Sequence, residues 1–476
     1  MLFLYLIISD ESPLLFTNIK QFLLLSLLAF ICSFSSGLFA KEFTVTPADN
    51  LQKMLDASEN GDSLTLSPGQ YFGNFVINKQ ITLRGSSDGE KKASVIDAQG
   101  SGHALVLKNA HITIDNLTIV NWGHDLTEQN SGIYSHEKVD NKKAEGIVIS
   151  NNTLSGDGFG IWLNYVTKAK IFNNTVEGNL ALRSADRGNG IQVANVTHSH
   201  VFKNETFKTR DGIYVISSQN NLIENNVMHD LRYGIHYMYS YDNTVKGNTA
   251  YSTRAGYALM SSRRLTITDN KTTDSEDYGF LLNFITKSTF TNNHIKQVWT
   301  KPENKVLGRD GKGLFVYNSG YNTLENNTVD TAEIGIHLTA GSENIKIFEN
   351  SFINNPTQVK YVSNKKQEWS KDGRGNYWGN YLGWDMNNDG IGDAIFEPND
   401  GIDKLVWQYP EMKMIMDSPA ILILRWVQKQ FPVLKPPGVK DSHPLMTPHF
   451  SQENIKRKQH ALANALKSES LQEEKL

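Results

Sequence analysis

The segments GIYVI (residues 212–216), GIHYM (234–238) and GYALM (256–260) repeat one pattern at steps of 22 residues. A Gly followed by an apolar residue continues the pattern in both directions, at Gly160, Gly190, Gly279, Gly313 and Gly335. An Asn recurs in the same register, from Asn152 to Asn350. Two ladders in one register indicate a repeat architecture with longer coils near residues 177–189 and 297–311.

A repeat of 22 residues is too short for a βαβ unit and suits a coil of three short strands and three turns. Apolar residues one and three positions after each Gly, such as Ile161 and Leu163, predict strands with an inward core face. We therefore expect an all-β, right-handed parallel β-helix with an N-terminal cap helix near Leu51 and a short helical C-terminal extension. The Gly residues are expected in left-handed turns, and the Asn residues in amide ladders.

The chain divides into five predicted regions. Residues 1–40 resemble a signal peptide, because Lys20 precedes the apolar run from Phe22 to Ile31 and Leu38-Phe39-Ala40 reads as a cleavage site. An uncleaved membrane anchor is the alternative. The remaining regions are the β-helix (41–365), a Trp/Asn/Asp-rich block (366–410), a segment with Met residues, an amphipathic helix and a Pro-rich docking part (411–450), and a polar tail (451–476).

Composition limits the partners. The 47 Lys and Arg residues nearly balance the 50 Asp and Glu residues, so a general electrostatic affinity for nucleic acid is not expected. The single cysteine, Cys32, lies within the predicted signal peptide. An exported, cleaved chain would have no thiol, and a site for a soft metal would have to use Met and His.

Positions two and four after each Gly are expected to point outward. His236, Met238 and Met260 occupy them on neighbouring coils about 4.8 Å apart, and thioether and imidazole groups suit Cu(I). The alternative is that these side chains lie beneath a covering loop. The aromatic residues of this face, together with one in the C-terminal helix, predict a partner surface: Trp162, Tyr214, Phe315, Tyr317 and Trp426.

Two further metal motifs follow the repeats. Asp385, Asn387, Asp389 and Asp393 match the first part of a Ca²⁺ loop, although Phe396 stands where a bidentate Glu is usual; a plain turn is the alternative. Met412, Met414 and Met416 would share one face of a strand and could hold copper, or they could be hydrophobic contacts.

The chain resembles the NosD family, periplasmic β-helix proteins of nitrous oxide reductase maturation. The resemblance rests on residues 233–238 and 256–260, the block from Asn376 to Asp393, and the end from Pro437 to Met446. It implies a complex with a membrane permease and an ABC ATPase, a lipoprotein copper chaperone as donor, and nitrous oxide reductase as the client whose copper–sulfur centre is assembled. The resemblance implies copper as cargo, and the sequence does not distinguish copper, sulfur or both. The chain has no Gly-x-x-x-x-Gly-Lys-Ser/Thr motif, so ATP hydrolysis is expected in a partner.

The main alternative is a polysaccharide lyase, hydrolase or epimerase on the same scaffold. Such an enzyme needs acids and a base aligned over neighbouring coils. The outward positions contain no Asp or Glu, which favours a binding protein over an enzyme.

Overall fold

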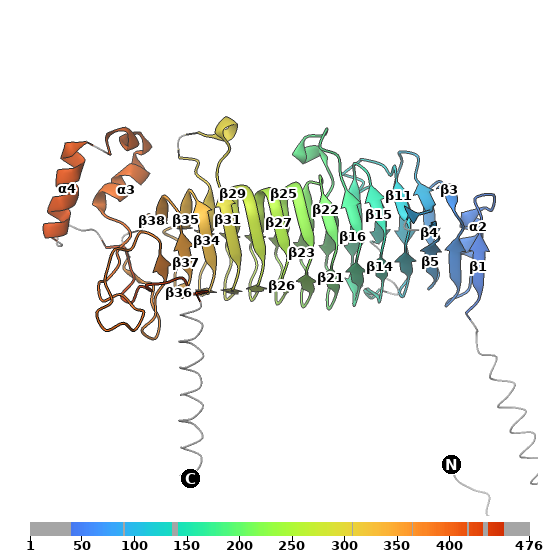
Figure 1. The fold of residues 1–476 in the computed structure, drawn as a ribbon. Coiled ribbons are helices and arrows are strands. Elements are labelled where there is room, and N and C mark those ends of the chain that lie inside the picture. Colours follow the sequence, from blue (N-terminus) through green and yellow to red (C-terminus); the bar gives the residue numbers. More distant parts are fainter. Residues whose placement is uncertain are drawn as a thin grey trace, which may run out of the picture.

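The computed structural model describes residues 40–88, 91–135, 141–306, 308–363, 365–416, 418–431 and 437–451. The predicted signal peptide therefore lies outside the described residues except for Ala40, as does the polar tail after Ser451. Figure 1 shows one elongated solenoid, with two loops projecting from one side and a helical unit at its C-terminal end. Among the described helices, none is long and apolar enough to cross a bilayer.

The predicted right-handed parallel β-helix is confirmed: in the two long sheets, each strand pairs in parallel with the equivalent strand of the next coil. One sheet has 13 strands: β1 (Glu42–Val45), β2 (Ser63–Leu66), β5 (Thr82–Gly85), β10 (Thr113–Asp115), β14 (Val148–Ser150), β18 (Lys170–Phe172), β21 (His200–Phe202), β24 (Leu222–Glu224), β26 (Thr244–Lys246), β28 (Thr266–Thr268), β30 (Thr289–Thr291), β33 (Thr323–Glu325) and β36 (Lys346–Phe348). The cap helix is α2 (Leu51–Ala57), capped by Asn50.

The second sheet has 22 strands and carries the Gly ladder. Its strands are β3 (Gly69–Phe72), β4 (Phe75–Ile77), β8 (Ser94–Asp97), β9 (Leu105–Leu107), β11 (Thr118–Val120), β12 (Ser131–Ser135), β15 (Thr153–Ser155), β16 (Phe159–Asn164), β19 (Thr175–Glu177), β20 (Ile191–Ala194), β22 (Glu205–Phe207), β23 (Asp211–Ile216), β25 (Val227–Met238), β27 (Thr249–Met260), β29 (Lys271–Asn283), β31 (His294–Val298), β32 (Lys312–Tyr317), β34 (Thr328–Ala332), β35 (Ile334–Leu338), β37 (Ser351–Ile353), β38 (Thr357–Tyr361) and β40 (Tyr377–Trp378). Three two-stranded pairs complete the strands: β6 (Ser87–Asp88) with β7 (Lys91–Lys92), β13 (Ala144–Glu145) with β17 (Val166–Thr167), and β39 (Gln367–Glu368) with β41 (Val439–Lys440).

The predicted amide ladder is present. From Asn152 onward the side-chain amide of each ladder Asn donates to the side-chain oxygen of the next, at 2.9 Å between Asn226 and Asn248 for example. The same oxygen also accepts the backbone N–H of the preceding ladder Asn. The ladder thereby satisfies buried polar groups at one corner of every coil along its length, which explains why these positions require Asn.

The Gly ladder has a different cause from the one expected. The left-handed conformation belongs to the residue before each ladder Asn, such as Asn225 and Asp269, whereas Gly234 does not adopt positive φ. A Cβ on Gly234 would lie 2.5 Å from the Gly256 carbonyl oxygen and 2.8 Å from the Ala250 Cβ. The Gly residues are therefore required by the close approach of stacked backbones.

The two longer coils form the projecting loops that contain η1 (Ser184–Asp186) and η2 (Pro302–Asn304). Arg309 ties the second loop to the β-helix through Asp277, at 2.9 Å. Lys305 of the same loop contacts Glu333.

A helical unit follows the last coils: α3 (Gly401–Gln408), η3 (Pro410–Ile415) and α4 (Pro419–Gln430). The amphipathic helix predicted within residues 411–450 is thus confirmed as α4, and α3 is additional. Arg425 of α4 pairs with Asp403 of α3 at 2.8 Å and contacts Asp400. These ion pairs fix the two helices against each other.

Residues 438–449 form a strap that returns to the β-helix. Strand β41 pairs with β39, Leu445 bridges to Tyr377, and Val439 and Leu445 are buried. Asp441 accepts hydrogen bonds from the Asn376 backbone N–H at 2.7 Å and from Trp378 Nε1 at 2.8 Å. This part of the segment predicted to dock a partner closes the end of the solenoid.

Candidate metal site

The strands of the Gly ladder bend at the Gly, so that the residue before it meets the residue two after it. Phe159 and Trp162 stack edge to face at 4.5 Å between ring centroids. Tyr233 and His236 do so at 5.2 Å, and Lys312 lies over Phe315. Simple alternation assumes a straight strand and therefore predicts an open outward face. Instead, four residues of its central coils are buried: Gln192, His236, Ala258 and Leu281.

His236 is held by a buried carboxylate. Its Nδ1 lies 2.9 Å from Asp211 Oδ2, and Asp211 comes from the preceding coil. Arg232 donates to both oxygens of the same carboxylate, at 2.8 and 2.7 Å. Burial alone would raise the pKa of Asp211, but the hydrogen bonds from His236 and Arg232 hold it below its usual value. Asp211 is not one of the outward positions of the alternation, because it directly precedes Gly212, yet its carboxylate reaches His236.

The other ring nitrogen of His236 has no hydrogen-bond partner. Nε2 is buried and lacks a partner among the described residues. Tyr214 covers one face of the imidazole at 4.5 Å, while the next residue in register, Ala258, contributes only a methyl group. An unsatisfied buried polar atom costs about 1–3 kcal/mol, so a ligand that bonded to Nε2 would remove this cost.

The two methionines of the predicted set are neighbours in register. Met238 of β25 pairs with Met260 of β27, and both side chains are half-buried. The Tyr214 hydroxyl donates to Met238 Sδ at 3.2 Å while its ring stacks on His236. In the described part of the chain, no three His, Cys, Asp or Glu side chains form a group that could hold a metal. One imidazole and two thioethers are the donor set preferred by Cu(I) rather than by a harder ion.

The Tyr214 hydroxyl thus contacts the Met238 sulfur that the predicted copper site would use. We predict that Tyr214→Phe, which keeps the stacked ring but removes the O–H···S contact, will bind Cu(I) about 2- to 10-fold more tightly, because the metal no longer competes with a hydrogen bond of about 1 kcal/mol. Competition with a chromogenic Cu(I) chelator measures this effect. Tyr251→Phe, a tyrosine that stacks on His229 instead, is the control.

The second methionine set does not join the first. Met412, Met414 and Met416 were expected on a strand, but Met412 and Met414 lie in the 3₁₀ helix η3, so alternate residues do not share a face. Met414 is 92 % exposed. The coil of β27 and the coil of β38, beside which the helical unit lies, are four coils apart, roughly 19 Å. The two sets cannot form one metal site.

The acidic loop after the solenoid is internally bonded. Asp385 accepts the backbone N–H groups of Asp389 and Gly390, and Asp393 accepts that of Met386. Phe396, at the position of the usual Glu, packs against Trp378 at 5.0 Å between centroids. A turn stabilised by its own side chains accounts for this geometry, and Ca²⁺ binding by Asp385, Asn387, Asp389 and Asp393 stays a prediction.

The residues proposed as a partner surface differ in accessibility. Trp162, Tyr214 and Phe315 are half-buried against neighbouring rings, with Phe315 stacked on Tyr278 at 5.3 Å. Tyr317 is 41 % exposed and Trp426 is 60 % exposed. Trp426 belongs to an exposed apolar group on α4 with Leu422, Ile423, Leu424 and Phe431 at its end.

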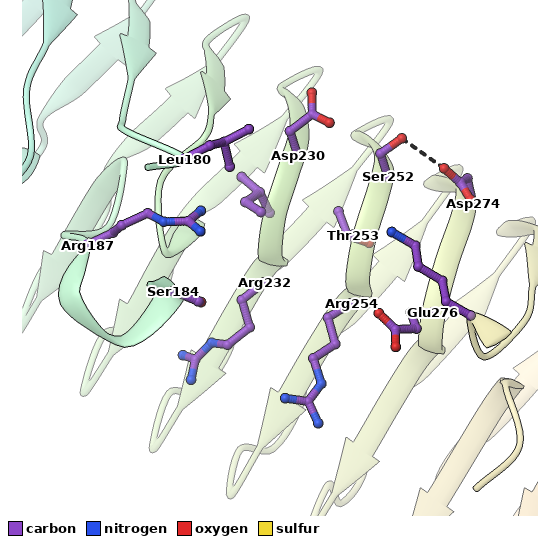
Figure 2. Close-up of a pocket in the computed structure, with 12 residues that line it drawn as sticks. Leu180, Ser184, Arg187, Asp230, Arg232, Ser252, Thr253, Arg254, Asp274 and Glu276 are labelled. Atoms are coloured by element: carbon purple, nitrogen blue, oxygen red, sulfur yellow. Dashed lines mark hydrogen bonds between the residues drawn. The ribbon is translucent and has the colours of Figure 1, made fainter. Parts of the chain in front are cut away.

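A cleft of about 450 Å³ lies over β25, β27 and β29, between the two projecting loops. Figure 2 shows Arg232 and Arg254 extending in parallel from neighbouring strands, with Leu180, Ser184 and Arg187 of the first loop beside them. Asp211 pairs with Arg232, and Asp277 pairs with Arg254 at 2.5 Å. Asp230, which also lines the cleft, contacts His229. Arg232 therefore connects the lining of the cleft to Asp211.

Fold and candidate site together define a parallel β-helix protein that carries imidazole and thioether groups on neighbouring coils. Residues 172–383 match the family model described as "Periplasmic copper-binding protein (NosD)". The chain is 48 % identical over 403 residues to a Pseudomonas aeruginosa protein named "Probable ABC transporter binding protein NosD", covering 84 % of this chain and 91 % of that one. A protein of the same name from Stutzerimonas stutzeri is 47 % identical over 384 residues, 80 % and 86 % of the two chains. The chain belongs to the NosD family.

Solved structures share the fold alone. A mannuronan C-5 epimerase A-module of Azotobacter vinelandii superposes with a TM-score of 0.50 at 13 % identity, over 65 % of this chain and 89 % of that one. A DFA-IIIase of Arthrobacter chlorophenolicus also gives 0.50, at 12 % identity, over 68 % and 98 %. At such identities the likeness does not extend to their activities.

Proposed function

We propose that this chain is the periplasmic copper-binding subunit of an ABC-type complex that supports assembly of the copper–sulfur centre of nitrous oxide reductase. The observation that carries the proposal is the buried, unpartnered Nε2 of His236 beside the register pair Met238 and Met260. The relatives' names as ABC transporter binding proteins support the association with a transporter. Copper is cargo in this proposal, and sulfur remains a second candidate cargo.

In this function the chain binds and presents metal, and ATP hydrolysis belongs to the partner ATPase. A copper chaperone lipoprotein would load the site, and the reductase would receive the metal. His236 would contribute one nitrogen, and Met238 and Met260 one sulfur each. Thioethers are neutral ligands, so release of Cu(I) requires no proton transfer at sulfur, which suits transient binding.

Replacing His236, Met238 and Met260 together with Ala tests this assignment. We expect Cu(I) uptake by the purified chain and metallation of the reductase in cells to fall to background. The matched variant replaces Met412, Met414 and Met416, which lie in and just after η3, and is expected to keep uptake. Unchanged uptake in the first variant, or loss only in the second, would contradict the proposed site.

The contact with the membrane permease is assigned to α4. Arg425 and Gln428 hold the helix onto α3, while Leu422, Ile423 and Trp426 remain exposed. An exposed apolar face on a helix fixed from its other side is typical of a docking surface. The strap, which the sequence had grouped with this helix, is engaged with the β-helix instead.

Leu422→Asp with Trp426→Asp is expected to abolish co-purification with the permease. Two charges at the centre of an apolar contact, together with the loss of an anchoring Trp, should weaken binding by at least about 30-fold. Leu382→Asp is the control, because Leu382 is 94 % exposed in the acidic loop and belongs to another surface. If both variants lose co-purification with the permease equally, or if the α4 variant keeps it, the contact lies elsewhere.

A further inference from the structure

We propose that Asp211 is a positioning residue that fixes the tautomer of His236 and so makes Nε2 the metal-binding nitrogen. This inference rests on the proposed copper site and deepens it. Asp211 Oδ2 lies 2.9 Å from His236 Nδ1, and the ring's other nitrogen has no partner among the described residues. The arrangement leaves one nitrogen bonded and the other open.

Arg232 holds the Asp211 carboxylate in place, and it is the carboxylate that determines which atom carries the hydrogen. Its Nε and Nη2 donate to the two oxygens of Asp211, at 2.8 and 2.7 Å, in a bidentate pair. A carboxylate held in this way offers only acceptor positions, so the hydrogen in its contact with His236 resides on Nδ1. A neutral imidazole with hydrogen on Nδ1 has its lone pair on Nε2, where a metal can bind.

The packing fixes the ring orientation as well. Tyr214 stacks on one face of His236 and Tyr233 lies edge-on, so the imidazole cannot exchange its two nitrogens by rotation without displacing these rings. Arg232 in turn lies over the Tyr233 ring at 4.3 Å. Carboxylate partners of metal-binding histidines typically contribute 10- to 100-fold to metal affinity through such orientation.

The chain provides a matched control. Asp277 is also buried and also pairs with arginines, with Arg254 at 2.5 Å and Arg309 at 2.9 Å. It lies further along the same face, and its hydrogen-bond and ion-pair partners do not include His236. Asp277→Asn therefore removes a buried carboxylate from an arginine pair without altering the hydrogen bond to His236.

The experiment combines ¹⁵N NMR of histidine-labelled full-length chain with Cu(I) affinity from chelator competition. In the metal-free wild type we expect His236 to carry its hydrogen on Nδ1. In Asp211→Asn the amide can donate to Nδ1, so the Nε2–H tautomer should gain population and Cu(I) affinity should fall about 10- to 100-fold. Asp277→Asn should keep the tautomer and stay within about 2-fold of wild-type affinity.

Several outcomes would overturn the inference. One is an Nε2–H tautomer of His236 in the wild type. Another is an equal loss of Cu(I) affinity in Asp211→Asn and Asp277→Asn. The third is a change of the His236 tautomer in Arg232→Gln, a variant that keeps the carboxylate. The wild-type spectrum and Arg232→Gln decide the question if Asp211→Asn does not fold. His236→Ala separates the two levels: if it leaves Cu(I) affinity unchanged, the proposed copper site fails. If His236→Ala lowers Cu(I) affinity and Asp211→Asn does not, the proposed copper site is supported and the positioning role of Asp211 is contradicted.

Discussion

Ending the chain after Phe431 is expected to unravel the last coils of the β-helix and to lower its free energy of unfolding by roughly 5 kcal/mol or more. The strap buries Val439 and Leu445 completely or nearly so, and each such side chain contributes about 1.5–3 kcal/mol. Its removal also leaves the Asn376 backbone N–H and the Trp378 Nε1–H without acceptors, at about 1–3 kcal/mol each.

Hydrogen exchange measured along residues 345–378 tests this expectation, together with the thermal unfolding midpoint. A chain that ends at Ser451 is the control, because it keeps every contact of the strap. Similar exchange in the two truncated chains would show that the strap does not stabilise the solenoid. The result also matters for assays of partner binding. A truncation that removes both α4 and the strap could abolish binding either because the docking helix is missing or because the end of the solenoid unfolds.

The repeat was predictable because its cause is local. A coil of 22 residues places one Gly and one ladder Asn in the same register each time, and both are required by contacts with the next coil, as at Gly234 and Asn248. Inward residues such as Ile213 and Val215 are fully buried, as alternation predicts. The fold class, the cap helix and the positions of both loops could therefore be predicted from the local sequence pattern.

The site was only partly predictable because it depends on a bend within the strand. The register that placed Met238 beside Met260 is correct. Asp211, however, directly precedes a Gly, and alternation on a straight strand gives no reason to place it with His236, two positions after the Gly of the next coil. The pairing of a carboxylate or aromatic residue before the Gly with a polar residue after it is the signal that could have revealed this contact.

The strap was not predictable because its contacts are non-local. Asp441 takes the place of the next ladder Asn, some 65 positions after Asn376, and no periodicity links the two residues. The Pro-rich sequence before it gave no indication of that return. The Met residues at 412 and 414 were misassigned for a related reason, since alternate spacing is compatible with a strand but does not require one, and the chain there forms η3.

Asp441→Asn is expected to remove most of the pH dependence that the end of the solenoid gives to stability. Burial raises the pKa of Asp441 to about 6, although hydrogen bonds from Asn376, Trp378 and His443 oppose this. Between about pH 4 and 6 the folded state therefore keeps a proton that the unfolded chain has lost. Stability must fall as pH rises through this window, by about 3 kcal/mol in total.

The amide oxygen of Asn can still accept from Asn376 and Trp378 but carries no charge at any pH, so the variant should lose little stability at pH 4 and gain relative to wild type at pH 7. Denaturant unfolding at the two pH values, followed by the fluorescence of the buried Trp369 and Trp378, measures the difference. Asp393→Asn, in the exposed acidic loop, is the control and should follow the wild type. Parallel pH profiles for wild type and Asp441→Asn would mean that Asp441 is ionised in the folded chain throughout this range, and that the ladder ends on a charge.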